Sequence, residues 1–63
     1  MNTKARVLAI LEENRRTVVS GQTLAQAAGV SRTAVWKAME QLRQDGHRIQ
    51  GATNRGYMLA ADS

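Results

Sequence analysis

The sequence contains no cysteine and no proline, and Trp36 and Tyr57 are its only aromatic residues. The absence of cysteine excludes disulfide bonds and cysteine-based zinc sites, so packing alone must stabilise the fold. Runs of apolar residues are no longer than residues 7–11, which is too short for a signal-peptide core or a membrane span. With 63 residues, the chain has room for one small domain and none for a deep substrate cleft beside its core.

The composition is rich in positive charge. Nine Lys and Arg face five Asp and Glu, which gives a net charge of +4, and seven of the nine cations are arginine. A guanidinium group can donate two parallel hydrogen bonds to a phosphate or to the edge of a guanine. Nucleic acid is therefore a candidate partner, although charge alone does not identify it.

Hydrophobic periodicity predicts three helices, which follow caps at Asn2 or Thr3, at Ser20 and at Ser31. The first runs to about residue 14, the second ends at Gly29, and the third runs to about residue 45 before Gly46. Each helix has a stripe of residues expected to face the core: Val7, Leu8 and Leu11; Leu24, Ala25 and Ala28; Val35, Ala38, Met39 and Leu42.

The remaining segments predict a small sheet. Residues 18–19 are typical of a very short strand, and residues 48–50 and 57–59 alternate as in an antiparallel hairpin, with turn residues at 51–56. Residues 60–63 are expected to form a tail or a linker to a missing domain, which leaves residues 1–59 as the folded domain.

The link between the second and third helices is only residues 29–31, and so short a turn forces two helices to cross steeply. Ala25 is small enough for the close crossing, and Val35 fills the space between the helices. We therefore predict a mainly α fold with a small β-hairpin (α+β): a winged helix-turn-helix of three helices and a two- to three-stranded wing.

The polar face of the third helix and the hairpin tip are the candidate site. Helix N-termini favour phosphate because their free N–H groups point outward, and a cation at the hairpin tip could reach a minor groove or a flanking phosphate. The residues expected to contact DNA are Ser20, Gln22, Thr23, Ser31, Arg32, Thr33, Trp36, Lys37, Asn54 and Arg55.

Several side chains of this region have a second interpretation. Trp36 either packs partly into the core or is exposed and touches a thymine methyl group or a sugar. Glu40 either reads a cytosine amino group or, as we favour, lies beyond the groove. Lys37 and the hairpin tip are expected to contact DNA rather than to be merely solvated. Arg43 and Arg48 are expected to be solvated. Tyr57 is expected to anchor the hairpin to the core.

No catalytic, metal or cofactor site is expected. His47 is the only histidine and has no acidic partner nearby in the sequence. Gly51 and Gly56 have the glycine spacing of a phosphate-binding P-loop, but Tyr57 and Met58 replace the Lys-Ser/Thr pair that such a loop needs. The chain is therefore not expected to be an enzyme or to bind a small molecule.

Three stretches of the sequence carry a resemblance to a known family: residues 20–25, residues 29–37, and Arg55-Gly56-Tyr57-Met58-Leu59. Together with Leu42-Arg43 and Gly46, they look like the N-terminal DNA-binding domain of the biotin operon repressor, a family whose members are also biotin protein ligases. Many related wings have glycine where this chain has Asn54, and both residues tolerate the same backbone conformation. The resemblance implies a repressor of biotin genes that dimerises on its operator when loaded with biotinyl-adenylate, through domains absent from this sequence.

A DNA-binding transcription regulator is thus the predicted function, with double-stranded DNA as partner and no membrane. It would act in a bacterial cytoplasm, associated with the nucleoid, and the isolated chain is expected to be a monomer. A winged-helix protein–protein adaptor is the alternative, but it should expose an apolar patch, and none is evident beyond Trp36. An RNA-binding winged helix would favour more stacking aromatic residues than this sequence has.

Overall fold

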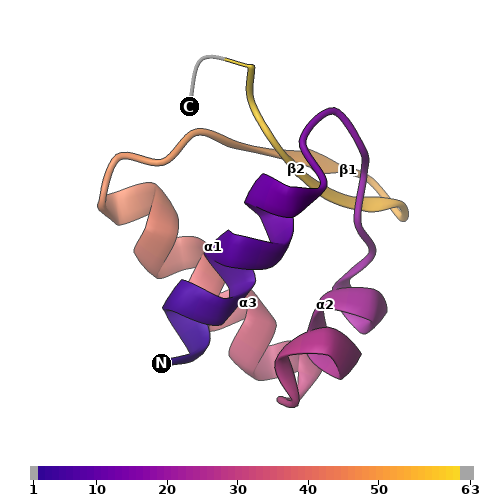
Figure 1. Ribbon diagram of the computed structural model, residues 1–63, viewed down its shortest axis with the longest axis vertical. Coiled ribbons are helices and arrows are strands. Elements are labelled where there is room, and N and C mark those ends of the chain that lie inside the picture. Colours follow the sequence, from indigo (N-terminus) through magenta and orange to yellow (C-terminus); the bar gives the residue numbers. More distant parts are fainter. Residues whose placement is uncertain (1, 62–63) are drawn as a thin grey trace.

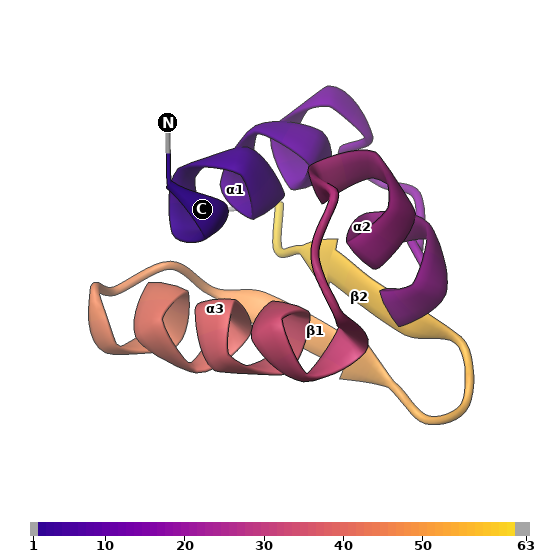
Figure 2. The same ribbon diagram turned by 90° about the horizontal axis from the view of Figure 1, so that it is seen from below.

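The computed structural model describes residues 2–61 and confirms the predicted α+β architecture. Within these residues the elements are α1 (Thr3–Glu13), α2 (Gly21–Ala28), α3 (Arg32–Gln44), β1 (Ile49–Ala52) and β2 (Gly56–Leu59). The two strands form an antiparallel hairpin that follows the three helices (Figure 1). Figure 2 shows α3 on one side of the molecule, α1 and α2 on the other, and the hairpin tip projecting beyond the N-terminal end of α3.

Each helix begins at a side-chain cap, as the sequence predicts. The cap oxygen accepts a hydrogen bond from a backbone N–H three residues later: Asn2 from Ala5 at 2.8 Å, Ser20 from Thr23 at 3.0 Å and Ser31 from Ala34 at 3.1 Å. Of the two candidates for the first cap, the structure therefore uses Asn2. Such a cap contributes about 1 kcal/mol because it satisfies an N–H group that the helix itself cannot.

The turn between α2 and α3 has the expected backbone. Gly29 adopts the left-handed conformation with φ of 71°, which glycine reaches without the steric cost that a Cβ would impose. The N–H of Val30 then donates to the carbonyl of Ala25 at 3.0 Å, which closes the end of α2. The chain can therefore turn into α3 within three residues, and this sets the crossing of the two helices.

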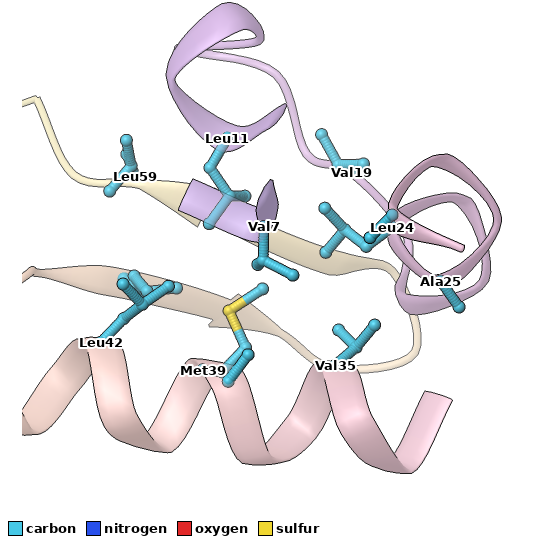
Figure 3. Packing of buried hydrophobic residues seen from close by; sticks show 12 residues of the cluster. Val7, Leu11, Val19, Leu24, Ala25, Val35, Met39, Leu42 and Leu59 are labelled. Carbon is cyan, nitrogen blue, oxygen red and sulfur yellow. The ribbon is translucent and has the colours of Figure 1, made fainter. Parts of the chain in front are cut away.

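The core lies between the three helices and the base of the hairpin. Side chains from α3 point toward those of α1 and α2 in Figure 3, and Leu59 closes the cluster from β2. Every residue predicted to face the core is buried except Leu8, which is half-buried against the cluster. The largest fully buried side chains are Val7, Leu11, Leu24, Val35, Met39 and Leu42.

The hairpin is longer than the sequence suggests. The sequence pattern predicts a turn over residues 51–56, but Gly51 pairs with Tyr57 and Ala52 pairs with Gly56, so the turn is confined to residues 53–55. Arg48, which the pattern includes in the first strand, precedes it. The glycines of the predicted turn therefore belong to the strands, and Gly56 lies directly against the backbone of Val19 and Ser20.

The segment before α2 pairs with the hairpin at one point. Val19 and Tyr57 exchange two backbone hydrogen bonds, of 2.8 and 2.9 Å, in an isolated antiparallel bridge. The predicted strand at residues 18–19 is thus reduced to a single bridging residue. Because Tyr57 also packs against the core, the expectation that it anchors the hairpin is confirmed.

Two arginines each connect a pair of successive elements. Arg6 of α1 donates from Nη1 to the carbonyl of Ala28, the last residue of α2, at 3.2 Å. Arg43 of α3 donates from Nη2 to the carbonyl of Ile49 in β1, also at 3.2 Å. The expectation that Arg43 is merely solvated is therefore wrong, because its guanidinium satisfies a carbonyl at the start of the hairpin.

The folded part of the chain continues past β2. Ala60 is buried, and its N–H donates to the carbonyl of Arg48 at 2.8 Å. The expectation of a frayed tail from residue 60 is therefore wrong for Ala60. Residues 62–63 of that predicted tail lie outside the described residues.

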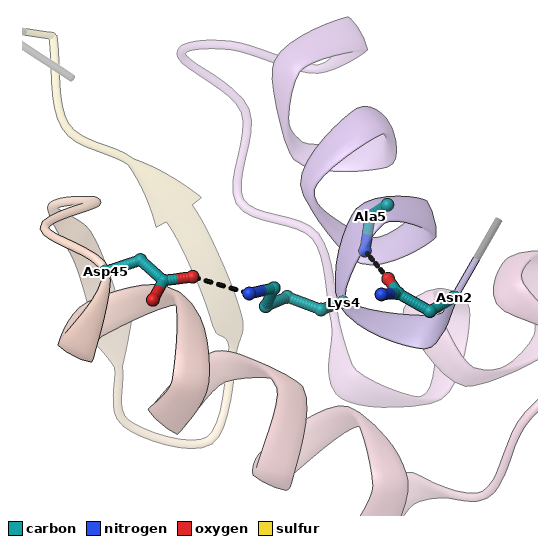
Figure 4. A network of polar contacts seen from close by, with 4 residues as sticks. All are labelled: Asn2, Lys4, Ala5 and Asp45. Atoms are coloured by element: carbon teal, nitrogen blue, oxygen red, sulfur yellow. Dashed lines mark hydrogen bonds and ion pairs between the residues drawn. The ribbon is translucent and has the colours of Figure 1, made fainter.

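An exposed ion pair joins the beginning of α1 to the end of α3. Lys4 Nζ lies 2.6 Å from Asp45 Oδ2 (Figure 4). The hydrogen bond and the positive charge of Lys4 hold the pKa of the Asp45 carboxyl below its usual value of 3.8.

This pair predicts a pH-dependent contribution to stability. The pKa of Asp45 is lower in the folded chain than in the unfolded chain, so the unfolded chain binds more protons as the pH falls. The contribution of the ion pair to stability is therefore lost when acid protonates the Asp45 carboxyl. We expect Asp45→Asn to be less stable than the original chain at neutral pH, and the difference to shrink as the pH falls through the lowered pKa of the Asp45 carboxyl. Urea unfolding from pH 7 to pH 2.5 measures this, and a difference that is constant across the range would contradict it.

Candidate nucleic-acid interface

An open groove of about 800 Å³ separates the hairpin from the N-terminal ends of α2 and α3. Its walls come from three elements that are far apart in the sequence but meet at one end of the molecule. The residues that line it are Ser20, Gly21, Arg32, Thr33, Val35, Trp36, Gly51, Ala52, Thr53, Asn54, Arg55, Gly56 and Tyr57. The groove is therefore formed where the helix-turn-helix meets the wing.

Six of the ten residues predicted to contact DNA line this groove. They are Ser20, Arg32, Thr33, Trp36, Asn54 and Arg55. The other four are exposed but do not line it: Gln22 and Thr23 at the start of α2, Ser31 at the cap of α3, and Lys37 in the second turn of α3. The fold thus brings the hairpin tip to the same end of the molecule as the two helix N-termini.

Arg32 is the first residue of α3, and this exposed residue lines the groove. A Cβ atom at Gly21 would lie 3.8 Å from both Nε and Nη2 of Arg32, and equally far from the Tyr57 ring. The guanidinium group therefore rests where the start of α2 meets the base of the hairpin. This places a permanent positive charge between two helix N-termini, which themselves favour anions.

Trp36 follows one helical turn after Arg32. Its side chain is 55% exposed, and it is the one large hydrophobic side chain exposed in the part of the chain that the structure describes. Of the two interpretations of Trp36, this exposure favours the one in which the ring is available at the surface. The indole is available to a ligand in the groove.

The hairpin tip presents Asn54 and Arg55. Asn54 has φ of 61°, in the left-handed region, and asparagine tolerates this conformation better than most residues. The N–H of Arg55 then donates to the carbonyl of Ala52 at 2.9 Å, which closes the turn. The tip is thus a tight turn with Arg55 exposed at its end.

The hydroxyls of Ser20, Thr23 and Ser31 take part in hydrogen bonds within the fold. Ser20 Oγ accepts from the Thr23 backbone and lies 2.9 Å from Thr23 Oγ1. Ser31 Oγ accepts from the Ala34 backbone. Ser20 and Ser31 therefore contribute to the site by capping α2 and α3, the helices whose N-termini line or flank the groove.

The charges around the groove favour an anionic ligand. No carboxylate is among the described residues that line it, whereas Arg32 and Arg55 are. Glu40 lies further along α3 and pairs with Arg43, with 3.5 Å between Glu40 Oε1 and Arg43 Nη1. This placement supports the preferred interpretation of Glu40 as lying beyond the contact.

Sequence reasoning missed the part of the groove wall that the hairpin backbone and the start of α2 provide. Gly21, Gly51, Ala52 and Thr53 line the groove, but none was a candidate contact. Their contribution depends on the pairing register of the hairpin and on its approach to α2. The only local signal was the small size of their side chains, and small residues are common in turns that bind nothing.

A metal-binding cluster and a membrane-spanning helix are both absent from residues 2–61. That part of the chain holds no cluster of three or more His, Cys, Asp or Glu residues placed to bind a metal ion. Its helices are too short and too polar for any of them to cross a membrane.

Comparison with known proteins connects this geometry to a family. The family described as "HTH domain" matches residues 3–58. Two relatives, each named "Bifunctional ligase/repressor BirA", from Bacillus spizizenii and Bacillus subtilis, are 46% identical to the chain over 41 residues. The aligned segment makes up 65% of this chain but 13% of each relative, so the chain spans a small part of their length.

Proposed function

The chain belongs to the HTH domain family, and we propose that it binds operator DNA as the recognition domain of a biotin operon-type repressor. What matches the family is a helix-turn-helix domain rather than a catalytic one. These residues are accordingly a binding module and not an enzyme. In this role the module works in a bacterial cytoplasm, on the double-stranded DNA of the nucleoid.

The observation that carries the proposal is the groove shared by α3 and the hairpin. It gathers Arg32, Trp36 and Arg55 at one end of the molecule, with no carboxylate among the described residues of its walls. A helix of thirteen residues at ~1.5 Å per residue is about 20 Å long, which suits a single crossing of a major groove. A hairpin tip beside it reaches the neighbouring backbone or minor groove.

The relatives supply the finer part of the proposal. Both are named as ligase and repressor in one protein, and the family match spans residues 3–58, which include the helix-turn-helix and most of the wing. A repressor needs an operator-binding part, and the family match supports that role for this chain. We propose that ligase activity, effector binding and dimerisation on the operator belong to other parts of the intact protein.

Duplex DNA binding with a strong salt dependence is the first expected result. If four to six phosphates are neutralised, log K should fall against log salt with a slope of roughly −4 to −5, because each contact releases condensed counterions. Titration of a fluorescein-labelled 20-base-pair duplex, followed by anisotropy between 50 and 200 mM salt, measures the slope. Binding that does not respond to salt, or no binding at low salt, would overturn the proposal.

Variants should separate reading of the sequence from positioning on the backbone. Arg32→Ala and Lys37→Ala are expected to cost about 1–3 kcal/mol on a preferred duplex wherever the side chain contacts a base edge bidentately. Arg55→Ala should weaken binding to all duplexes alike and reduce the salt slope by about one. The same titration on a duplex selected from a random pool and on a scrambled duplex measures both effects.

Arg16→Ala is the matched control for these variants. It removes one positive charge from the turn after α1, where Arg16 lines a separate small cavity with Met58 and Ala61. Its φ is 69°, so alanine meets the same backbone strain as arginine. We expect an unchanged salt slope for this variant, and a slope that falls as much as for Arg55→Ala would contradict the assignment of the interface.

A further inference from the structure

Trp36 is the one groove residue whose chemistry phosphate binding leaves unexplained. Its indole is 55% exposed and lies in a groove lined, apart from Val35 and Tyr57, by polar and small residues, with Gly51 and Ala52 contributed by the hairpin. These two residues carry little or no side chain, so the hairpin does not cover the ring. Leaving a tryptophan in water is unfavourable, and apolar surface that a ligand covers contributes about 25 cal/mol per Å².

The position of Trp36 on α3 limits what it can reach. The core residues Val35 and Met39 define the buried face of the helix, and Trp36 is turned about 100° from Val35. Thr33 and Lys37 lie on the opposite, outermost face. Trp36 therefore occupies the flank of the helix that faces the hairpin, and on bound DNA it would lie near the strand that passes between α3 and the hairpin.

We propose that Trp36 recognises A·T base pairs by packing its indole against the C5 methyl group of thymine. This inference rests on the proposed DNA-binding function. The thymine methyl is the only methyl group on the major-groove edges of the four base pairs, where the bases otherwise differ chiefly in their hydrogen-bond donors and acceptors. It projects from the outer edge of the base, next to its own strand's backbone, where a side chain on the flank of the helix arrives.

The surroundings of Trp36 favour DNA over an apolar protein partner. Arg32 and Arg55 share its groove, Lys37 follows it on α3, and no carboxylate is among the described groove residues. A protein ligand would have to neutralise these cations as well as cover the ring. A thymine beside its own phosphate supplies the negative charge and the methyl group together.

The test compares two duplexes that differ only in methyl groups. Both are 20-base-pair A·T duplexes with G·C clamps, one with thymine and the other with deoxyuridine throughout. Burying one methyl contributes about 0.8 kcal/mol, so we expect about fourfold tighter binding to the thymine duplex. Trp36→Ala should bind both duplexes equally, and Trp36→Phe should keep part of the preference because it keeps an apolar ring.

The control variant is Gln41→Ala, which changes an exposed residue on the other flank of α3 and should keep the full preference. Trp36 is also the only tryptophan, so its fluorescence reports on this position alone. We expect the thymine duplex to protect Trp36 from acrylamide quenching more than the deoxyuridine duplex does. Circular dichroism of each variant checks that it is folded.

The outcomes separate the two proposals. No binding to either duplex at low salt overturns DNA binding itself, and this inference with it. Binding that is equal for thymine and deoxyuridine, with Trp36→Ala weaker on both, places the indole on a sugar and overturns only the thymine contact. A methyl preference that survives in Trp36→Ala assigns the recognition to another residue and likewise overturns the role of Trp36.

Discussion

Replacing Gly56 by alanine is expected to destabilise the domain by about 2–4 kcal/mol. Gly56 has φ of 139°, and a Cβ atom there would lie 2.2 Å from the carbonyl oxygen of Val19 and 2.8 Å from Cα of Ser20. Both obstacles are backbone atoms, which cannot rotate away as a side chain can. The bridge between Val19 and Tyr57 would have to open to admit the methyl group.

The loss is large for a domain of this size. A core of about 60 residues rarely supplies more than about 3–5 kcal/mol, so Gly56→Ala should be only marginally stable near room temperature. Urea denaturation followed by circular dichroism measures the difference. Sucrose, which strengthens burial, can bring the variant into the measurable range.

Two other glycines are matched comparisons. Gly46 also has a positive φ, of 101°, but no atom would lie within 4 Å of its Cβ, so alanine there meets conformational strain alone. Gly51 lies in β1 with ordinary φ, and its Cβ would meet only the Arg43 guanidinium at 3.7 Å. We expect little loss, or a gain of about 0.5 kcal/mol, at Gly51. A loss at Gly51 as large as that at Gly56 would contradict the role assigned to the Val19 backbone.

Features with a local physical cause could be predicted from the sequence. Ser20 and Ser31 cap their helices because the side-chain oxygen and the N–H that it accepts from are three residues apart. Gly29 ends α2 because its own backbone must become left-handed. The spacing of Val35, Ala38, Met39 and Leu42 shows which face of α3 is buried. None of these arguments needs the position of another element.

Features that depend on distant pairing could not be predicted. The hairpin extends to Ala52 and Gly56 because its register and the Val19 bridge hold those backbones together, and the residues themselves resemble turn residues. Arg43 satisfies the Ile49 carbonyl, which no helical spacing reveals. For the same reason the exposure of Trp36 stayed open, since it depends on what the hairpin places opposite α3.

Joining two copies of this chain in tandem is expected to raise its affinity for a duplex with two recognition sites by ~10²–10⁴ over that of one copy. A single module of this size buries roughly 600–1,000 Å² of surface on DNA, the low end for specific recognition. We therefore expect a micromolar or weaker dissociation constant for the single chain. The hairpin also offers little edge for pairing between copies, since β1 has four residues and β2 is partly occupied by Val19.

The dimensions of the domain allow this arrangement. Its longest extent is 27 Å, and half-sites one helical turn apart are ~34 Å from centre to centre, so two copies can lie side by side without overlap. A Gly/Ser linker of about 36 residues has a root-mean-square length of roughly 33 Å, which matches that span and keeps the effective concentration high. The tandem protein on a duplex with one site is the control, and it should bind no more than about twofold tighter than a single copy.

Sedimentation of the free chain and titration of one-site and two-site duplexes complete the test. Untethered copies should load the two sites nearly independently, because each helix-turn-helix contacts its own half-site and little apolar surface of the described residues remains to join them. A stable dimer of the free chain, or strongly cooperative loading without a tether, would show that this domain carries a dimer contact of its own. If the tandem protein gains nothing on the two-site duplex, the modules cannot engage both sites at once, and the docking of α3 and the hairpin inferred from the groove would be wrong.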